Sequence, residues 1–279
     1  MEQALLDFIE QQYGNVEIAQ KFPIPCISAL AEVAFQERVA KLPRRCVYPF
    51  CMRLVGQSGA GKTTQLLPAV ESVFQQTNVS PVFLAVRNFV HYHPHLEAIR
   101  QQYGENLLRE NTNAFALSLL VLVFEKCVQK RYPIVFEVTL QSPLFEAYIH
   151  ALLEKNAYAC DYQCLAIAKK DSDAWIQARY LATRRQVSLK SAQFFFETLN
   201  PALKFLQTIR LPNRFFIWNR YQLGPDVSFC QDPLLLEKVE GARLENNRSA
   251  FEEDILREAK KQFLCRFYEQ HPIVYKLNS

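Results

Sequence analysis

A dense cluster of glycines constrains this chain more than any other feature of its sequence. Three of its seven glycines lie within six residues, which indicates a backbone that needs them. An apolar run ends at Val55 and residues 63–75 show helical spacing, so the cluster joins a strand to a helix, as the phosphate-binding pattern GxxxxGK(S/T) requires. The segment that fits this pattern, called the P-loop below, comprises Gly56, Gln57, Ser58, Gly59, Ala60, Gly61, Lys62, Thr63 and Thr64.

The P-loop predicts a nucleoside triphosphate site. Its glycines let successive backbone N–H groups point at phosphate oxygens, and the start of the following helix favours an anion. We expect Lys62 to reach the terminal phosphates and the Thr63 hydroxyl to ligate Mg²⁺. The residues from Gly56 to Thr64 are therefore the expected nucleotide-binding residues, with Mg²⁺ as cofactor and either ATP or GTP as nucleotide.

Short apolar strands alternate with helical patterns along the rest of the chain. Because such an alternation favours parallel strands joined by helices, we predict an α/β fold: a P-loop NTPase-type, mostly parallel sheet flanked by helices, with helical N- and C-terminal extensions. The strands are expected at residues 47–55, 81–86, 133–138, 162–168 and 214–218. The helices are expected at residues 2–12, 27–41, 63–75, 96–110, 113–129, 145–155, 172–183, 191–209 and 251–267.

Composition argues against several other classes of protein. The net charge is +4, and Lys and Arg are spread along the chain, so a nucleic-acid partner is not indicated. The eight cysteines form no CxxC pair, which disfavours a zinc ribbon and suits free thiols in a reducing cytoplasm. Met1–Gln12 lacks the basic start and apolar run of a signal peptide. Phe115–Phe124 is too short to span a bilayer, so we expect a buried core helix, no membrane partner and a cytoplasmic protein.

Further short motifs follow the P-loop in a fixed order, and together they resemble the zeta toxin family of P-loop kinases. The resemblance covers Val47–Arg220 and rests on the order and spacing of the motifs. After the P-loop these are Phe89 with His93-Pro94, the strand Tyr132–Thr139 with its Glu-x-Thr ending, Arg179-Tyr180, and Trp218-Asn219-Arg220.

The resemblance implies a function and assigns roles to residues. Family members phosphorylate the 3'-hydroxyl of the sugar in UDP-N-acetylglucosamine, so a small-molecule acceptor of this kind is expected. Glu137 would hold Mg²⁺ together with Thr63, directly or through water. Arg179 would lie in a lid and neutralise the transferring phosphoryl group, with Arg184 or Arg185 as a second lid arginine. The implied catalytic residues are thus Lys62, Glu137 and Arg179, and a toxin-like protein implies a neutralising or target protein partner.

One position departs from the family pattern. Family kinases carry a catalytic Asp at the end of the second strand, but alignment on Phe89 and His93-Pro94 places Arg87 there. A guanidinium cannot act as a base near neutral pH, and no Asp occurs between Lys62 and Asp161. Without a replacement base, such as His91, His93 or Glu97, transfer should be slower by about 10²–10⁴-fold.

Three functions therefore stay open at the level of the sequence. The leading one is an ATP- or GTP-dependent small-molecule kinase with a sugar nucleotide as the candidate acceptor. The alternative is a catalytically impaired relative that binds nucleotide and acts through a protein partner, as Arg87 suggests. A polynucleotide 5'-hydroxyl kinase would need a basic track with aromatic side chains for stacking, which the sequence lacks. The expected domains are an N-terminal helical extension at 1–45, a P-loop kinase-like domain at 46–225, and a C-terminal helical extension at 226–279.

Overall fold

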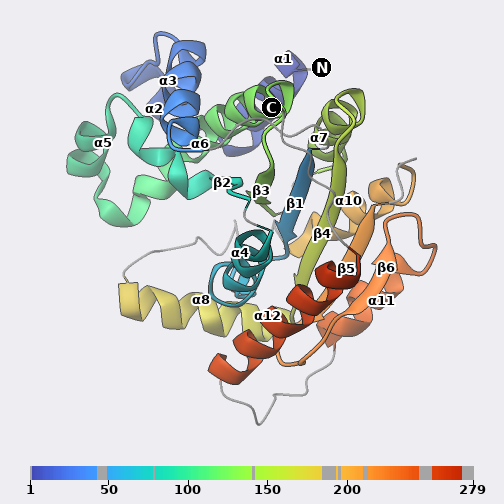
Figure 1. Cartoon of the computed structure of the whole chain (residues 1–279). Helices are drawn as coiled ribbons and strands as arrows, with labels where there is room; N and C mark the ends of the chain where they lie inside the picture. The colour runs from blue at the N-terminus through green and yellow to red at the C-terminus, as the bar shows by residue number, and fades with distance from the viewer. Residues whose placement is uncertain are drawn as a thin grey trace.

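A six-stranded sheet runs through the molecule in the order β2-β3-β1-β4-β5-β6 (Figure 1). The computed structural model describes residues 2–42, 49–77, 79–139, 142–183, 193, 196–209, 213–244 and 253–271. The first five strands along the chain are parallel to their neighbours, and β6 pairs antiparallel with β5. This confirms the predicted fold class. The strands are β1 (Phe50–Val55), β2 (Val82–Ala85), β3 (Ile134–Glu137), β4 (Ala159–Ala166), β5 (Arg214–Asn219) and β6 (Asp226–Phe229).

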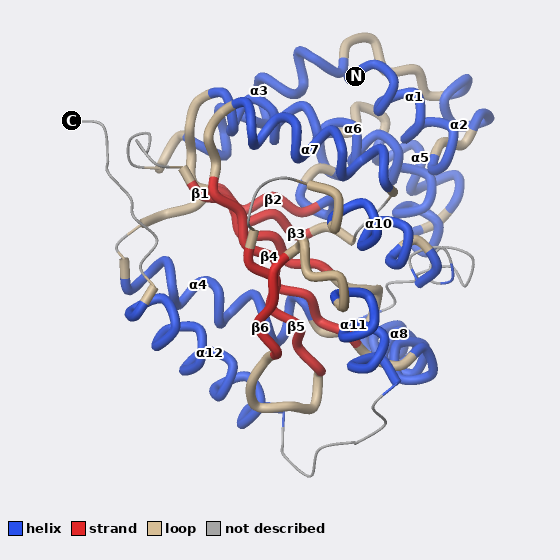
Figure 2. Tube along the Cα trace, turned by 90° about the vertical axis from the view of Figure 1, so that its right-hand side faces the viewer, coloured by secondary structure: helices blue, strands red, loops and turns tan. Residues whose placement is uncertain are grey.

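Helices cover both faces of the sheet, because both faces of its central strands are apolar. On β1, Met52 and Leu54 join the hydrophobic core under α4 and α12, whereas Cys51 and Val55 join the core on the opposite face. Figure 2 shows α4 and α12 together on one side of the sheet, with α3, α6 and α7 on the other. The helices are α1 (Glu2–Tyr13), α2 (Val16–Lys21), α3 (Ile27–Val39), α4 (Leu67–Gln76), α5 (Leu96–Tyr103), α6 (Glu105–Gln129), α7 (Pro143–Lys155), α8 (Lys169–Thr183), α10 (Leu199–Leu206), α11 (Leu235–Leu244) and α12 (Glu253–Gln270).

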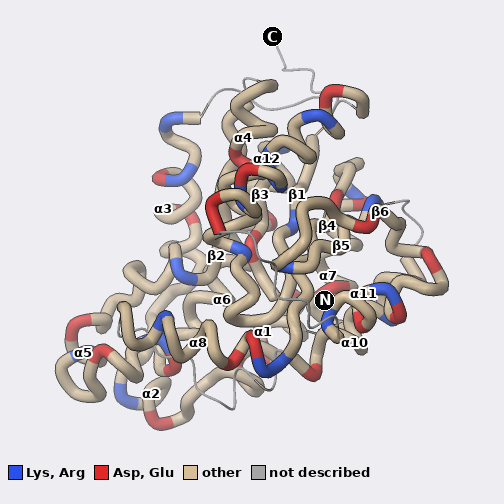
Figure 3. Tube along the Cα trace, turned by 90° about the horizontal axis from the view of Figure 1, so that it is seen from below, with Lys and Arg blue, Asp and Glu red and all other residues tan. Residues whose placement is uncertain are grey.

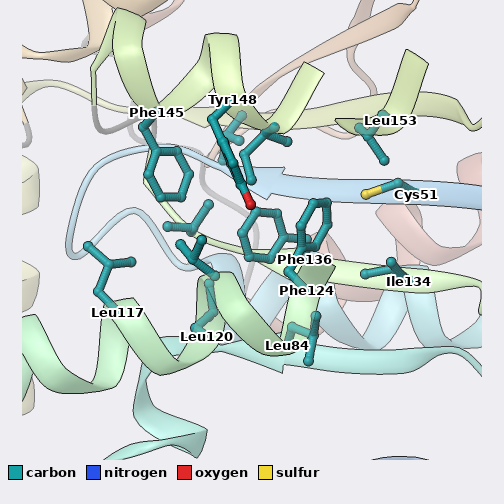
Figure 4. Close-up of a cluster of buried hydrophobic side chains, with 14 of the residues drawn as sticks. Cys51, Leu84, Leu117, Leu120, Phe124, Ile134, Phe136, Phe145, Tyr148 and Leu153 are labelled. Atoms are coloured by element: carbon teal, nitrogen blue, oxygen red, sulfur yellow. The ribbon is translucent and has the colours of Figure 1, made fainter. Parts of the chain in front are cut away.

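Helix α6 is the central helix of the larger core. It is the one helix in the described part of the chain that is long and apolar enough to cross a membrane, yet 72% of that apolar window is buried inside the protein. Phe124 stacks on Phe136 of β3 at 4.7 Å between ring centroids, and Figure 4 shows these rings packed with Phe145 and Tyr148 of α7. Helix α6 is therefore a core helix of this fold.

The boundaries of α5 and α6 differ from the sequence expectation. We expected helices at 96–110 and 113–129, but the break lies at Gly104, whose φ is +79°, and α6 then continues to Gln129. Thr112 sits inside this helix and its hydroxyl donates to the Leu108 carbonyl at 2.7 Å. Burial of the apolar face outweighs the weak helix propensity of the Asn-Thr-Asn stretch.

Other differences lie at short or late elements. Helix α2 and strand β6 were not expected, and β4 begins at Ala159 rather than at residue 162. The predicted start of the first strand at residue 47 lies outside the described residues, as does part of the helix expected at 191–209.

The terminal helices pack against the sheet-bearing core. Leu5 of α1 and Phe35 of α3 belong to the hydrophobic core on the α6 side of the sheet. Leu264 and Tyr268 of α12 belong to the core on the α4 side. The proposed domain boundaries stay a prediction. Lys and Arg alternate with Asp and Glu along the described chain rather than forming one basic face in the view of Figure 3.

Candidate functional site

Three parallel strands bring their carboxyl ends to the same edge of the sheet. Strand β1 runs into the P-loop, β2 runs into a 3₁₀ turn (η2, Val86–Asn88), and β3 ends at Glu137. The strand register brings the three strand ends level with one another, because Glu137 pairs with Leu54 of β1 and with Ala85 of β2. Ligands of open α/β sheets bind at this edge.

The three P-loop glycines occupy positions where any side chain would be strained. Gly56, Gly59 and Gly61 have φ values of +130°, +79° and +102°, a region that disfavours side chains. A Cβ at Gly56 would lie 2.4 Å from the Leu165 carbonyl oxygen, and one at Gly61 would lie 2.3 Å from Nη1 of Arg220. The glycine spacing in the sequence therefore reflects the positive φ angles that the loop adopts.

Lys62 lies over the loop that precedes it. Its Nζ donates to the carbonyl oxygens of Gly56 at 2.6 Å and Gln57 at 2.9 Å. Burial lowers the pKa of Lys62 to about 8; the Glu137 carboxylate opposes this shift, while the positive charges of Arg179 and Arg109 add to it. Phosphate oxygens would replace the two carbonyls as partners and favour the charged ammonium.

The remaining loop residues divide into buried anchors and exposed donors. The Gln57 side chain is 1% exposed and donates to the Ile167 carbonyl, and the Ser58 carbonyl accepts from the hydroxyl of Ser172 on α8. Ala60 is buried. The exposed Thr64 hydroxyl donates to the Gly61 carbonyl at 3.4 Å. The loop is thus fastened to the β4–α8 connection.

Thr63, Glu137 and Arg87 form a contiguous polar group beside Lys62. The Thr63 hydroxyl donates to Oε1 of Glu137 at 2.9 Å. Nη1 of Arg87 donates to Oε2 of Glu137 at 2.8 Å and to the Thr63 hydroxyl at 3.4 Å. Arg87, which stands where the family carries a catalytic Asp, therefore puts a permanent positive charge against Thr63 and Glu137, the two expected metal ligands.

The expected Mg²⁺ can be tested against this geometry. Thr63 Oγ1 and Glu137 Oε1 provide adjacent oxygen donors of the kind that Mg²⁺ prefers. However, the guanidinium of Arg87 already donates to both residues, so a second positive charge at these oxygens would be repelled. The donor set suits Mg²⁺, but the site as arranged does not fit a resident metal ion.

The structure brings further arginines to the loop. Arg179 of α8 is near enough for its charge to lower the pKa of Lys62, as is Arg109 of α6. No sequence motif pointed to Arg109. Arg184 and Arg185, the proposed second lid arginines, lie outside the described residues.

Arg220 is a buried residue that contacts the P-loop backbone. Only 3% of this residue is exposed, and its Nη1 donates to the Ala60 carbonyl at 2.9 Å. The guanidinium stacks on Trp175 of α8 at 3.9 Å and pairs with Glu253 of α12. Arg220 formed part of a recognised motif, but its contact with the loop could not be inferred from sequence.

The candidate replacement bases His91, His93 and Glu97 are engaged in packing or in an ion pair. His93 is 4% exposed and its ring packs edge-on against Phe115 at 4.7 Å. Burial, reinforced by His95, lowers the pKa of His93 to about 4. His91 packs on Tyr92 at 4.0 Å, and Glu97 pairs with Arg100. These contacts account for His93 and Glu97 without a catalytic role.

Comparisons with known proteins agree with the fold and the motif order. The sequence model of the zeta toxin family matches residues 34–222 of this chain. Toxin PezT of Streptococcus pneumoniae serotype 4 is 31% identical over 122 residues, which are 44% of this chain and 46% of PezT. The chain thus matches about half the length of this curated relative.

Two solved structures share the fold. A chain from the structural study of the PezAT chromosomal toxin-antitoxin system of Streptococcus pneumoniae superposes with a TM-score of 0.61 at 17% identity, covering 88% of this chain and 98% of that one. A chain of the AvrRxo1-ORF1:AvrRxo1-ORF2 complex has a TM-score of 0.51 at 13% identity, covering 96% and 83%. At these identities the likeness concerns the fold alone.

Proposed function

The chain belongs to the zeta toxin family, and we propose that it binds ATP or GTP at the P-loop and transfers the terminal phosphoryl group to a hydroxyl of a small molecule. The observation that carries this proposal is the position of Lys62, whose ammonium lies over a loop with three glycines at positive φ. Such a loop presents backbone N–H groups and a cation to phosphate oxygens.

The chain's own residues supply the electrostatics that phosphoryl transfer needs. Lys62 and Arg179 would offset the negative charge on the transferring group, which is the main task of the protein in this reaction. The family resemblance makes a sugar nucleotide such as UDP-N-acetylglucosamine the first acceptor to test. Proton removal has no assigned base, because Arg87 occupies the position of the family's Asp, so turnover should be slow.

Transfer of label tests the proposal. The protein is incubated with γ-labelled ATP or GTP and with UDP-N-acetylglucosamine or a fractionated metabolite extract. We expect a labelled acceptor with the wild type and none with Lys62→Ala. If no labelled acceptor forms although the nucleotide binds, the kinase proposal fails and only nucleotide binding is retained.

A second function is favoured by the Arg87–Glu137 ion pair. A relative with this pair could bind nucleotide without transferring phosphate and act through a protein partner. We propose such a partner because the matched family is that of toxins, and one neighbouring fold comes from a toxin-antitoxin system. Partner capture that requires nucleotide and is lost in Lys62→Ala would support this function. A cytoplasmic location stays a proposal, which cell fractionation tests.

A further inference from the structure

Arg87 places a cation against Thr63 and Glu137 at the P-loop edge of the sheet. In P-loop proteins a metal ion bridges the loop Thr, a carboxylate and the phosphates. Here Nη1 of Arg87 is 2.8 Å from Oε2 of Glu137 and 3.4 Å from the Thr63 hydroxyl. The guanidinium thus contacts both protein residues that such a metal would use.

The turn that carries Arg87 is held from two sides. The Arg87 guanidinium lies over the Phe83 ring at 5.4 Å. Arg38 of α3 donates to the Asn88 carbonyl at 2.7 Å and stacks on the fully buried Phe89. Helix α3 therefore holds the backbone just after Arg87, while Phe83 packs against the guanidinium that reaches Glu137.

The exposure of the pair leaves room for a ligand. The Arg87 side chain is 41% exposed, whereas that of Glu137 is 9% exposed. Arg87 can therefore keep one N–H on Glu137 and offer others to a phosphate oxygen, since a guanidinium has five donors. The buried carboxylate then orients the arginine.

The charge at this edge of the sheet suits a nucleotide without metal. Lys62 belongs to the P-loop and Arg87 contacts its Thr63, while Arg179 and Arg109 are near enough to influence Lys62. A metal-free triphosphate is more negative than its Mg²⁺ complex, so a cluster of fixed cations favours it. A Mg²⁺ at Thr63 and Glu137 would instead lie against a permanent positive charge.

We propose that Arg87 serves as a built-in cation of the triphosphate site, so that the P-loop binds metal-free ATP or GTP. Glu137 positions Arg87 and does not act as a metal ligand. This inference rests on the proposed nucleotide binding and replaces the Mg²⁺ that the sequence led us to expect.

Calorimetric titration of the full chain with ATP, in excess Mg²⁺ and in excess EDTA, tests the inference. We expect the wild-type dissociation constant in EDTA to stay within about threefold of its value in Mg²⁺. A wild type that loses about tenfold or more of its affinity in EDTA would overturn the built-in cation while leaving nucleotide binding intact. Absence of binding in both conditions would overturn the proposed function as well.

Substitutions separate Arg87 from the general charge of the site. Arg87→Ala leaves the Glu137 carboxylate facing the triphosphate, so affinity in EDTA should fall by about tenfold or more and be recovered with Mg²⁺. Arg87→Lys keeps the charge and should remain insensitive to EDTA. Arg109→Ala, the matched control, removes one positive charge from the same surroundings and should weaken binding equally in both conditions. Equal responses of Arg87→Ala and Arg109→Ala would contradict the assignment.

Glu137→Gln gives an independent readout. If Glu137 only positions Arg87, its amide should weaken ATP binding by about threefold or less and to the same extent in Mg²⁺ and EDTA. A loss confined to the Mg²⁺ condition would identify Glu137 as a metal ligand and overturn the inference. Thermal melting of each variant without nucleotide shows that it is folded.

Discussion

Two arginine–glutamate pairs join strands of the sheet to their neighbours, and their surroundings differ. Arg53 of β1 and Glu146 of α7 form a pair in which both side chains are 0% exposed. Arg87 and Glu137 form a pair at the carboxyl edge, with side chains 41% and 9% exposed. We call these the closed pair and the open pair.

The difference shows how location decides what such a pair can do. Arg53 also donates to the Tyr162 hydroxyl at 3.0 Å and lies between the rings of Phe136 and Tyr162, at 5.2 and 5.1 Å. The closed pair is surrounded by protein, so it can act only on the fold. The open pair faces Thr63 and solvent, so a ligand can join it.

Breaking the closed pair should have the largest effect on stability. Arg53→Ala leaves the Glu146 carboxylate buried without its partner, which should lower the free energy of unfolding by about 3–5 kcal/mol. Chemical denaturation measures this loss. The double variant Arg53→Met with Glu146→Leu removes both charges and should recover most of it. A single variant that loses less than about 1 kcal/mol would mean that the closed pair is not structural.

Removing Lys62 should have the next largest effect, on binding rather than on stability. Lys62→Ala loses hydrogen bonds to a charged ligand, worth about 1.5–3 kcal/mol or roughly 10- to 150-fold in ATP affinity. Lys155→Ala is the matched control, because it removes a lysine from the last turn of α7, which leads to the opposite edge of the sheet. Equal affinities of the two variants would contradict a triphosphate site beside the open pair.

The pH dependence of binding should give a smaller effect. The pKa of Lys62 is lowered to about 8 mainly by burial, so free protein loses this positive charge as pH rises through that value. Because the triphosphate prefers the charged ammonium, affinity should be nearly full at pH 7 and fall by about tenfold between pH 7 and pH 9. Lys62→Arg stays charged and should show a flat profile by the same titration. A wild-type profile as flat as that of Lys62→Arg would refute the role of burial.

Breaking the open pair should have the smallest effect on stability. Arg87 is substantially exposed and, in its absence, Glu137 keeps the Thr63 hydroxyl as a donor, so the pair should contribute as little as a surface ion pair, about 0–1 kcal/mol. Arg87→Ala should therefore change the free energy of unfolding by less than about 1 kcal/mol. Denaturation of Arg87→Ala beside Arg53→Ala makes the comparison direct, and similar losses would show that both pairs serve the fold.

Local patterns in the sequence predicted the parts of this molecule that local geometry determines. The glycine spacing located the P-loop because each glycine has a positive φ. The alternation of apolar strands and helical patterns predicted the fold class. The spacing in sequence between Arg87 and Phe89 predicted that Arg87 follows the second strand. The glycine spacing, the alternation of strands and helices, and the position of Arg87 each depend on residues close together along the chain.

Features that depend on distant contacts were not accessible to the same reasoning. The closed pair joins Arg53 to a helix 93 positions later, and Arg220 reaches the loop from 160 positions away. The register of β1, β2 and β3, which brings Glu137 level with the loop, is set by packing rather than by any single strand. Strand β6 has only four residues, and its polar–apolar alternation is too short to distinguish a strand from a loop.

A structure of the full chain with ATP, obtained with Mg²⁺ present, would show whether Arg87 or a metal ion binds the terminal phosphate. We predict phosphate oxygens bound by the backbone N–H groups of the P-loop and by Lys62, with the Arg87 guanidinium on a terminal phosphate and still on Glu137. A triphosphate bound away from the loop would contradict the nucleotide site. A Mg²⁺ held by Thr63 and Glu137, with Arg87 displaced, would contradict the built-in cation.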